Sequence, residues 1–312
     1  MKCGYITILG RPNAGKSTLI NKFVGQKIAG VSRKPQTTRN KILGVLTKQT
    51  DQFIFLDTPG LHKTKGTKLN RMMNQVANAS VSDADVLVYL IDPTNDLDDL
   101  DQVFLKSIFE KSNQPIFIGL TKRDKVGKKQ IIQCLASTQA FMDSLEKESS
   151  EKRRFIKIMP ISAKISSDTD EVLKTISALL PEGPWLFEDD DMTDRSEKFI
   201  CSELIREQVF RSLGQEIPYG CAVMVDDIKY GDDLVTVLAK IMVSRFNHKG
   251  MVIGKGAQTI KKIGAVSRTV LENHFGSKVY LDLKVQVAKG WIDDENLIKE
   301  LSYMSELDEV TL

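Results

Sequence analysis

The stretch Gly10–Ser17, which reads Gly-Arg-Pro-Asn-Ala-Gly-Lys-Ser, constrains the fold of this 312-residue chain more than any other feature. It follows an apolar run at 5–9 and precedes a helix-like segment at 18–24. A strand, a glycine-containing loop and a helix start are the context in which this pattern holds phosphate groups. Lys16 is expected to reach the β- and γ-phosphates, and the Ser17 hydroxyl to ligate Mg²⁺. The predicted phosphate site comprises Gly10, Arg11, Pro12, Asn13, Ala14, Gly15, Lys16, Ser17 and Thr18.

Composition limits the remaining possibilities. With 41% hydrophobic and 27% charged residues, the chain is typical of a soluble globular protein with two domains. Its longest apolar runs fall short of the roughly 18 residues that a membrane span needs, and the N-terminus lacks a secretory signal pattern. The four cysteines lie far apart, which predicts a reduced, cytoplasmic protein without a disulfide-linked partner.

Charge is distributed unevenly although the formal net charge is only +3. Residues 1–50 contain no acidic residue, residues 188–194 are acidic, and residues 240–289 are again basic. A basic block of this kind favours contact with a polyanion, although a solvated basic face is the alternative.

Residues 1–180 alternate between strand-like and helix-like segments. Strands are predicted at 3–10, 42–46, 53–56, 84–91, 115–120 and 155–161, and helices at 18–24, 68–82, 98–111, 128–147 and 169–180. The pattern predicts an α/β domain with a mixed, mostly parallel sheet and helices on both faces. The third strand runs into Asp57-Thr58-Pro59-Gly60, where Asp57 is placed to bind Mg²⁺ through water. The Gly60 N–H can register the loss of a γ-phosphate.

The second half begins after a linker predicted at 181–196. A helical pattern from Ser196 precedes strands at 222–228 and 235–243, a Gly-rich loop within 251–264, a helix through Phe275 and a strand at 279–287. This order predicts an α+β domain at 197–290 and a helical tail at 291–312. Segment 253–257 reads Ile-Gly-Lys-Gly-Ala within the basic block.

The motifs together resemble the Era family, in which a P-loop GTPase domain precedes a type II KH domain. Gly-Arg-Pro-Asn, Gln-Thr-Thr-Arg, Asp-Thr-Pro-Gly, Thr-Lys-Arg-Asp and Ser-Ala-Lys occur in the order typical of that family. The resemblance implies that GTP and GDP are bound by the phosphate loop together with Asp57, Thr58, Pro59, Gly60, Leu61, Thr121, Lys122, Arg123, Asp124, Ser162, Ala163 and Lys164. Asp124 can accept from guanine N1–H and the exocyclic amine together, which adenine does not offer. Thr121 departs from the family's usual asparagine and loses an amide donor.

The expected catalytic residues are Lys16, Thr38, Gly60 and Asn13. Thr38 is expected to join Ser17 and Asp57 at Mg²⁺, with Thr37 as the alternative. Leu61 stands where Ras-like GTPases carry a glutamine that orients water, so slow intrinsic hydrolysis is expected. Related GTPases use a monovalent cation held by an asparagine that matches Asn13, which makes K⁺ a candidate second cofactor.

The second domain is expected to clamp an RNA backbone with the loop that KH domains use. The predicted contacts are Ile253, Gly254, Lys255, Gly256, Ala257, Lys261 and Lys262, with Ala257 where the family usually has glycine. By resemblance, the RNA is the 3′ end of 16S ribosomal RNA and the role is assembly of the small (30S) ribosomal subunit. Peripheral membrane association is known in the family, although no segment here forms a clear amphipathic membrane helix.

Two alternatives stay open from the sequence. A P-loop ATPase or kinase is disfavoured by Asp124 and Ser162-Ala163-Lys164. A passive RNA-binding module with an inactive nucleotide domain is disfavoured by the intact Lys16, Ser17 and Asp57.

Overall fold

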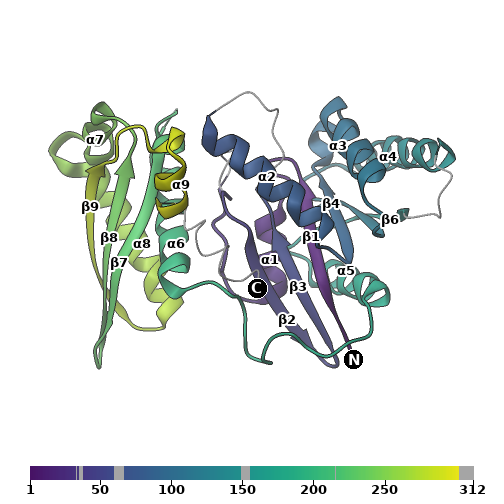
Figure 1. Cartoon of the computed structure of the whole chain (residues 1–312), viewed down its shortest axis with the longest axis horizontal. Coiled ribbons are helices and arrows are strands. Elements are labelled where there is room, and N and C mark those ends of the chain that lie inside the picture. Colours follow the sequence, from purple (N-terminus) through teal and green to yellow (C-terminus); the bar gives the residue numbers. More distant parts are fainter. Residues whose placement is uncertain (33, 35–37, 60–66, 149–154, 215, 302–312) are drawn as a thin grey trace. The chain divides into compact units, whose positions relative to one another are not determined.

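The computed structural model describes the chain except residues 33, 35–37, 60–66, 149–154, 215 and 302–312 (Figure 1). Its contacts divide the chain into two units that do not follow chain order. Unit 1 contains Met1–Gln26, Lys41–Lys63 and Asn74–Asp194. Unit 2 contains Lys27–Asn40, Thr64–Met73 and Arg195–Leu312. Two short segments of the N-terminal half therefore belong by contact to the unit that holds the C-terminal half.

Unit 1 contains a six-stranded sheet in the order β2-β3-β1-β4-β5-β6 (Figure 1). Its strands are β1 (Lys2–Gly10), β2 (Ile42–Lys48), β3 (Asp51–Asp57), β4 (Val86–Ile91), β5 (Ile116–Leu120) and β6 (Phe155–Pro160). The helices of this half of the chain are α1 (Lys16–Val24), α2 (Lys68–Ser82), α3 (Asp99–Lys111), α4 (Lys128–Glu148) and α5 (Ser166–Leu179). Among the strands described for this sheet, only β2 is antiparallel to its neighbour, so the predicted mixed, mostly parallel sheet is confirmed.

The strands at the centre of this sheet are covered on both faces. All six residues of β4 are buried, as the continuous apolar run requires of a parallel strand in an α/β fold. Leu87, Tyr89 and Ile91 pack with residues of α3 and α4, whereas α1 packs on β1, β2, β3 and α5. The loops that carry the predicted nucleotide motifs follow the carboxyl ends of β1, β3, β5 and β6, where open α/β sheets bind ligands.

The segment predicted as a linker is held on unit 1 over most of its length. The Trp185 indole donates to the Thr50 carbonyl at 3.1 Å, and the Val45 N–H donates to the Met192 carbonyl at 2.9 Å. The side chain of Gln52 accepts the N–H groups of Leu186 and Phe187 at 2.9 and 3.0 Å. Residues 185–192 therefore run along the β2–β3 edge as part of unit 1.

Unit 2 contains a three-stranded sheet in the order β7-β8-β9. Its elements are α6 (Glu197–Ser212), β7 (Cys221–Tyr230), β8 (Leu234–Val243), α7 (Phe246–Ile253), α8 (Gln258–Phe275), β9 (Lys278–Val287) and α9 (Glu295–Leu301). β7 and β8 are antiparallel, and β9 runs parallel to β8 because α7 and α8 connect them. The predicted α+β order is confirmed. Among the described residues, every helix is too short or too polar to cross a membrane.

Helix α6 is buried on nearly all sides. Twelve consecutive residues from Phe199 to Phe210 are buried, including the charged Glu203, Arg206 and Glu207. The segment 27–40 contributes to this cover, since the Val31 N–H donates to Glu207 Oε2 at 2.9 Å. Lys27 forms an ion pair with the same carboxylate at 2.7 Å. The buried acid on α6 thus receives two of its partners from a segment about 170–180 residues earlier in the chain, and a third, Arg211, from α6 itself.

Candidate nucleotide and nucleic-acid sites

The loop between β1 and α1 has the backbone that a phosphate cradle requires. Gly15 lies at φ +102° and Asn13 at φ +66°, in a region that L-residues seldom adopt. A Cβ on Gly10 would lie 2.4 Å from the Leu90 carbonyl oxygen, so only glycine fits there. Helix α1 begins at Lys16, which directs its first N–H groups and its positive end toward this loop.

Lys16 is folded back onto its own loop. The ammonium donates to the carbonyl oxygens of Gly10 at 3.0 Å and Arg11 at 2.9 Å, and the residue is 6% exposed. Burial lowers the pKa of Lys16 to about 8, against the opposing effect of the Asp57 charge. A phosphate group is an anionic acceptor that would favour the charged form of this lysine.

Ser17 and Asp57 meet at the end of β3. The Ser17 hydroxyl donates to Asp57 Oδ2 at 2.6 Å, and Asp57 is fully buried. Thr58 beside it donates to the Ile8 carbonyl at 3.0 Å, which fixes the chain as it leaves the strand. A hydroxyl and a carboxylate this close are hard oxygen donors, so the residues present fit Mg²⁺. Gly60 and Leu61 lie outside the described residues.

Arg11 is engaged by α3. Its guanidinium pairs with Asp98, whose other oxygen caps α3 by accepting the N–H groups of Leu100 and Asp101 at 3.0 Å. This contact fixes the outer side of the phosphate loop to a helix that the sequence did not connect with it.

The loop after β5, residues 121–124, is bonded on one side to the end of β4. Both the N–H and the hydroxyl of Thr121 donate to the Ile91 carbonyl, at 2.8 and 3.1 Å. Lys122, at φ +57°, pairs with Asp92 at 2.5 Å. Burial favours neutral Asp92, but bonds from Lys122 and Thr94 outweigh it and lower the pKa of Asp92.

On the other side, the same loop is bonded to residues 162–164. The Ser162 hydroxyl donates to Asp124 Oδ1 at 2.8 Å, and the Lys164 ammonium lies 3.4 Å from Asp124 Oδ2. The bond from Ser162 is the main reason that the pKa of Asp124 is lowered. Ala163 lies in the turn between these two contacts. The residues predicted to read guanine are therefore brought together in unit 1.

Two acids in this region were missed by sequence reasoning. Asp92 pairs with Lys122, and Asp168 receives the guanidinium of Arg123 through both of its oxygens. Asp168 lies in the first turn of α5, where an acid is favoured by the helix dipole alone. From the sequence alone, Asp168 cannot be distinguished from an acid that only stabilises the start of a helix, so its contact with Arg123 could not be predicted.

The predicted Mg²⁺ ligand Thr38 lies in the part of the chain that packs with unit 2, and Thr37 lies outside the described residues. Beside Thr38, the buried Arg39 donates to the carbonyl oxygens of Cys221, Tyr219 and Pro218 at 2.6, 2.9 and 3.2 Å. Its guanidinium also lies 5.5 Å from the rings of Phe210 and Trp291. Burial lowers the pKa of Arg39 to about 9. Thr38 belongs to unit 2 whereas Ser17 and Asp57 belong to unit 1, so its role at Mg²⁺ stays a prediction.

The predicted RNA loop joins α7 to α8. A Cβ on Gly254 would lie 2.2 Å from Thr259 Oγ1, whereas a Cβ on Gly256 would meet nothing within 4 Å. Gly256 lies at φ +57° and Ala257 at φ +60°, so both positions are left-handed. Exposed lysines flank the loop, and Ile253 is half-buried behind it; the lysines are Lys255, Lys261 and Lys262.

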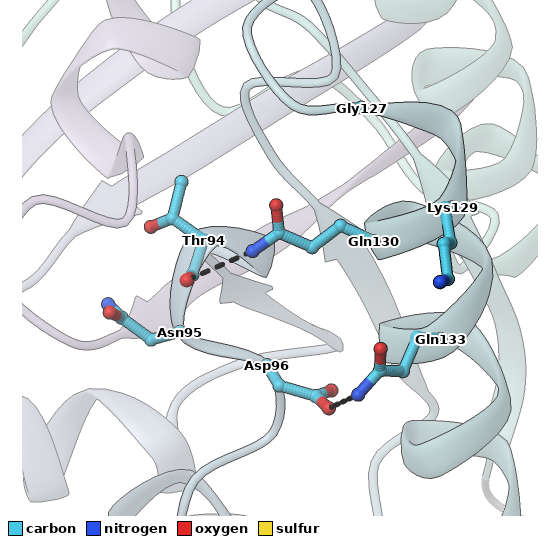
Figure 2. Close-up of a pocket in the computed structure, with 7 residues that line it drawn as sticks. All are labelled: Thr94, Asn95, Asp96, Gly127, Lys129, Gln130 and Gln133. Atoms are coloured by element: carbon cyan, nitrogen blue, oxygen red, sulfur yellow. Dashed lines mark hydrogen bonds between the residues drawn. The ribbon is translucent and has the colours of Figure 1, made fainter.

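A pocket of about 540 Å³ lies apart from the predicted motifs in sequence. Figure 2 shows its polar lining, in which Gln130 donates to the Thr94 carbonyl and Gln133 to Asp96. The lining residues are Thr94, Asn95, Asp96, Gly127, Lys129, Gln130 and Gln133. The pocket contains none of the predicted nucleotide or RNA residues, and the amides of Gln130 and Gln133 are bonded to neighbouring groups.

Family models match both halves of the chain, and related proteins match nearly all of it. Residues 5–122 match the family described as 50S ribosome-binding GTPase, and residues 216–292 match the KH domain. The chain is 41% identical to GTPase Era of Trichlorobacter lovleyi over 97% of its own length and 98% of that protein. It is 40% identical to GTPase Era of Coxiella burnetii over 96% and 98%, respectively.

Two solved structures resemble the whole chain. A variant of Aquifex aeolicus Era bound to GDP·AlF4⁻ shares 35% identity with a TM-score of 0.86, covering 97% of this chain and 99% of that one. Era in complex with MgGDPNP and nucleotides 1506–1542 of 16S ribosomal RNA shares 34% identity, with the same TM-score and coverage.

Proposed function

Because this chain belongs to the Era family of GTPases, we propose that it is a GTP-hydrolysing switch that binds the 3′ end of 16S ribosomal RNA during 30S subunit assembly. Both domains of the family are present, and the similarity to relatives extends over nearly the whole chain. The observation that carries the proposal is the contact of Ser17 with Asp57 at 2.6 Å beside the buried Lys16. These are the groups that a magnesium nucleotide needs.

In the proposed reaction, backbone N–H groups of the phosphate loop and of the first turn of α1 hold the phosphate oxygens, and Lys16 neutralises charge on the β- and γ-phosphates. Ser17 and Asp57 would hold Mg²⁺, which neutralises the charge that develops on the phosphates when it is bound. We assign Thr38 to closure over the γ-phosphate, Gly60 to sensing its loss, and Asn13 to a K⁺ ion beside the phosphates.

Base selection is assigned to the two loops bonded by Ser162 and Asp124. Asp124 accepts from guanine N1–H and the exocyclic amine, while the Ala163 N–H donates to guanine O6. The stem of Lys122 lies against the base. Thr121 uses both of its donors on Ile91, so the affinity for guanine depends on the other residues of these loops.

RNA binding is assigned to the loop 253–257 and its flanking lysines. Its left-handed glycine and open surface permit close approach of a nucleic-acid backbone, and the lysines supply the positive charge. A cytoplasmic location follows from this role, and a peripheral membrane fraction is kept as a part of the proposal.

The test measures turnover and RNA binding on the same preparations. GTP should be hydrolysed and ATP should fail to compete, while Ser17→Ala should lose turnover. A 16S 3′-end oligonucleotide should bind both proteins more tightly than a scrambled sequence of equal length. Absent turnover in the wild type with intact RNA binding would favour a passive RNA-binding module. Competition by ATP would favour an ATPase.

A further inference from the structure

The loop 121–124 is joined to helix α5 by an ion pair between Arg123 and Asp168, in addition to its contacts with residues 162–164. Arg123 places Nε on Asp168 Oδ2 and Nη2 on Asp168 Oδ1, the latter at 2.5 Å. This is a bidentate guanidinium–carboxylate contact. It fixes the relative orientation of the two side chains as well as their distance, because both groups are planar.

Asp168 also holds the second loop directly. Its Oδ2 accepts the backbone N–H of Ser162 at 2.8 Å, and the residue is only 8% exposed. One buried carboxylate therefore bonds to the residue before Asp124 and to the residue before Ala163. The same acid therefore contacts a sequence neighbour of each of the two residues proposed to read guanine.

The departure at Thr121 explains why such a bond matters in this chain. Thr121 spends its N–H and its hydroxyl on the Ile91 carbonyl, toward β4. Lys122 is also bonded on that side, through Asp92. Within the loop, the side chains of Arg123 and Asp124 are those that reach toward β6 and α5.

We infer that Arg123 and Asp168 are positioning residues for guanine, whose ion pair sets the spacing between the two base-reading loops. The inference rests on the proposed base site. It adds to that site a specificity determinant in α5, a helix that carries none of the recognised motifs.

The consequence is selective for the base. Inosine lacks the exocyclic amine, so an inosine nucleotide engages Asp124 through N1–H alone. A displaced Asp124 should therefore lower the affinity for GDP more than the affinity for IDP, because only GDP can lose the contact of its exocyclic amine with Asp124. Loss of general stability would weaken both nucleotides alike.

The test measures GDP, IDP and XDP affinities of the full-length protein by calorimetry, since diphosphates avoid turnover. Arg123→Met keeps the length of the side chain and removes the fork; we expect GDP affinity to fall about fivefold and IDP affinity by less. Arg123→Lys should lie between Arg123→Met and wild type, since an ammonium retains charge without the paired geometry. If the two residues act only through their ion pair, the double variant Arg123→Met/Asp168→Asn should lose no more of the preference for GDP over IDP than the more affected of the two single variants, Arg123→Met and Asp168→Asn. This preference is the GDP affinity divided by the IDP affinity.

Lys157→Met is the matched control, because Lys157 pairs with Glu171 of α5 at 2.6 Å on the exposed surface of the same unit. It should leave the GDP-to-IDP ratio unchanged. An unchanged ratio in folded Arg123→Met, with the fold checked by circular dichroism, would overturn the inference. Asp124→Asn tests the proposed base site separately from the positioning role of Arg123 and Asp168. A shift of nucleotide preference toward XDP in this variant supports the base site. Retained preference for GDP over XDP in that variant would remove the base site and this inference with it.

Discussion

Asp124 is the residue on which base selection depends. Its side chain is 22% exposed and its carboxylate is held by Ser162 and Lys164, so the carboxylate is pre-oriented. Asparagine at this position would supply a donor where guanine needs an acceptor. Xanthine carries a carbonyl at that place and can accept from the new amide.

We expect Asp124→Asn to lower kcat/KM for GTP by about tenfold to a hundredfold, the range for losing hydrogen bonds to a charged group. The same variant should raise kcat/KM for XTP. Steady-state hydrolysis with each nucleotide measures both values. A variant that keeps the wild-type ratio of the two would show that Asp124 does not contact the base.

Asn13 is the residue through which we predict K⁺ dependence. It is exposed and left-handed in the loop that precedes Lys16, and the residue directly after Gly60 is Leu61 rather than glutamine. Hydrolysis should be about tenfold faster in K⁺ than in Na⁺, which corresponds to about 1.4 kcal/mol of barrier. Asn13→Ala should lose the difference between the two salts. Equal wild-type rates at matched ionic strength would contradict this role.

Ala257 occupies a conformation that suits glycine better. At φ +60° and ψ +22° its Cβ crowds the backbone, which costs roughly 1–2 kcal/mol for an L-residue. Glycine removes that cost but adds unfolded-state entropy worth about 0.5–1 kcal/mol. Ala257→Gly should therefore stabilise unit 2 by roughly 0.5–1 kcal/mol in urea unfolding.

The control for that substitution is Ala265→Gly on the exposed surface of α8. There the same chemical change meets a helical backbone and should destabilise by about 1 kcal/mol. If both variants lose stability equally, the strain at Ala257 is absent.

Arg39 holds the segment 27–40 to the rest of unit 2. Three carbonyl oxygens accept from its guanidinium, which lies beside Phe210 and Trp291. Arg39→Met should lower the free energy of unfolding of unit 2 by about 3–5 kcal/mol, because those buried carbonyls lose their donor. Trp291 fluorescence in a Trp185→Phe background reports on this unit alone, since the chain has two tryptophans.

Lys229→Met provides the comparison for Arg39, because Lys229 forms only a loose, exposed ion pair with Asp227 at 3.8 Å. Its effect should stay within about 0.5 kcal/mol. Arg39→Met with an equally small effect would show that the segment is not anchored through this side chain.

Most elements were predictable from the sequence because hydrophobic periodicity and motif context are local. Helix α2 at Lys68–Ser82 has its predicted bounds, and the continuous apolar run of β4 is a buried parallel strand as predicted. Helix α5 begins at Ser166 rather than at Thr169, because its first turn contains serines that also favour turns. Ends of helices are where local signals are weakest.

The contacts that complete the candidate site were not predictable in the same way. The loops after β1, β3, β5 and β6 carry motifs whose chemistry is fixed by residue type, so their grouping follows from the topology. Asp92 and Asp168 are ordinary acids near helix starts, and only the fold brings them to Lys122 and Arg123. Arg39 bonds to carbonyls about 180 residues away, which no local pattern encodes. The roles of all these residues toward nucleotide stay predictions.

The molecule as a whole separates its two proposed binding chemistries. The phosphate loop and Asp124 belong to unit 1, and Gly254–Ala257 belongs to unit 2. A substitution confined to one loop should therefore remove one activity and spare the other. Gly256 suits this test because a side chain there meets no protein atom within 4 Å.

Gly256→Asp should fold, since aspartate tolerates the left-handed backbone found at φ +57° better than most residues. Its carboxylate would occupy the surface that a nucleic-acid backbone must approach and would repel phosphate. We expect affinity for a 16S 3′-end oligonucleotide to fall by at least about tenfold while GTP affinity stays at the wild-type value.

Lys255→Ala should weaken RNA binding less and reduce the slope of log affinity against log salt by about one. Fluorescence anisotropy across a salt series measures both variants, with circular dichroism as the check on folding. Wild-type RNA affinity in a folded Gly256→Asp protein would place the RNA site elsewhere, and the basic block around Lys261 and Lys262 would then be a solvated surface.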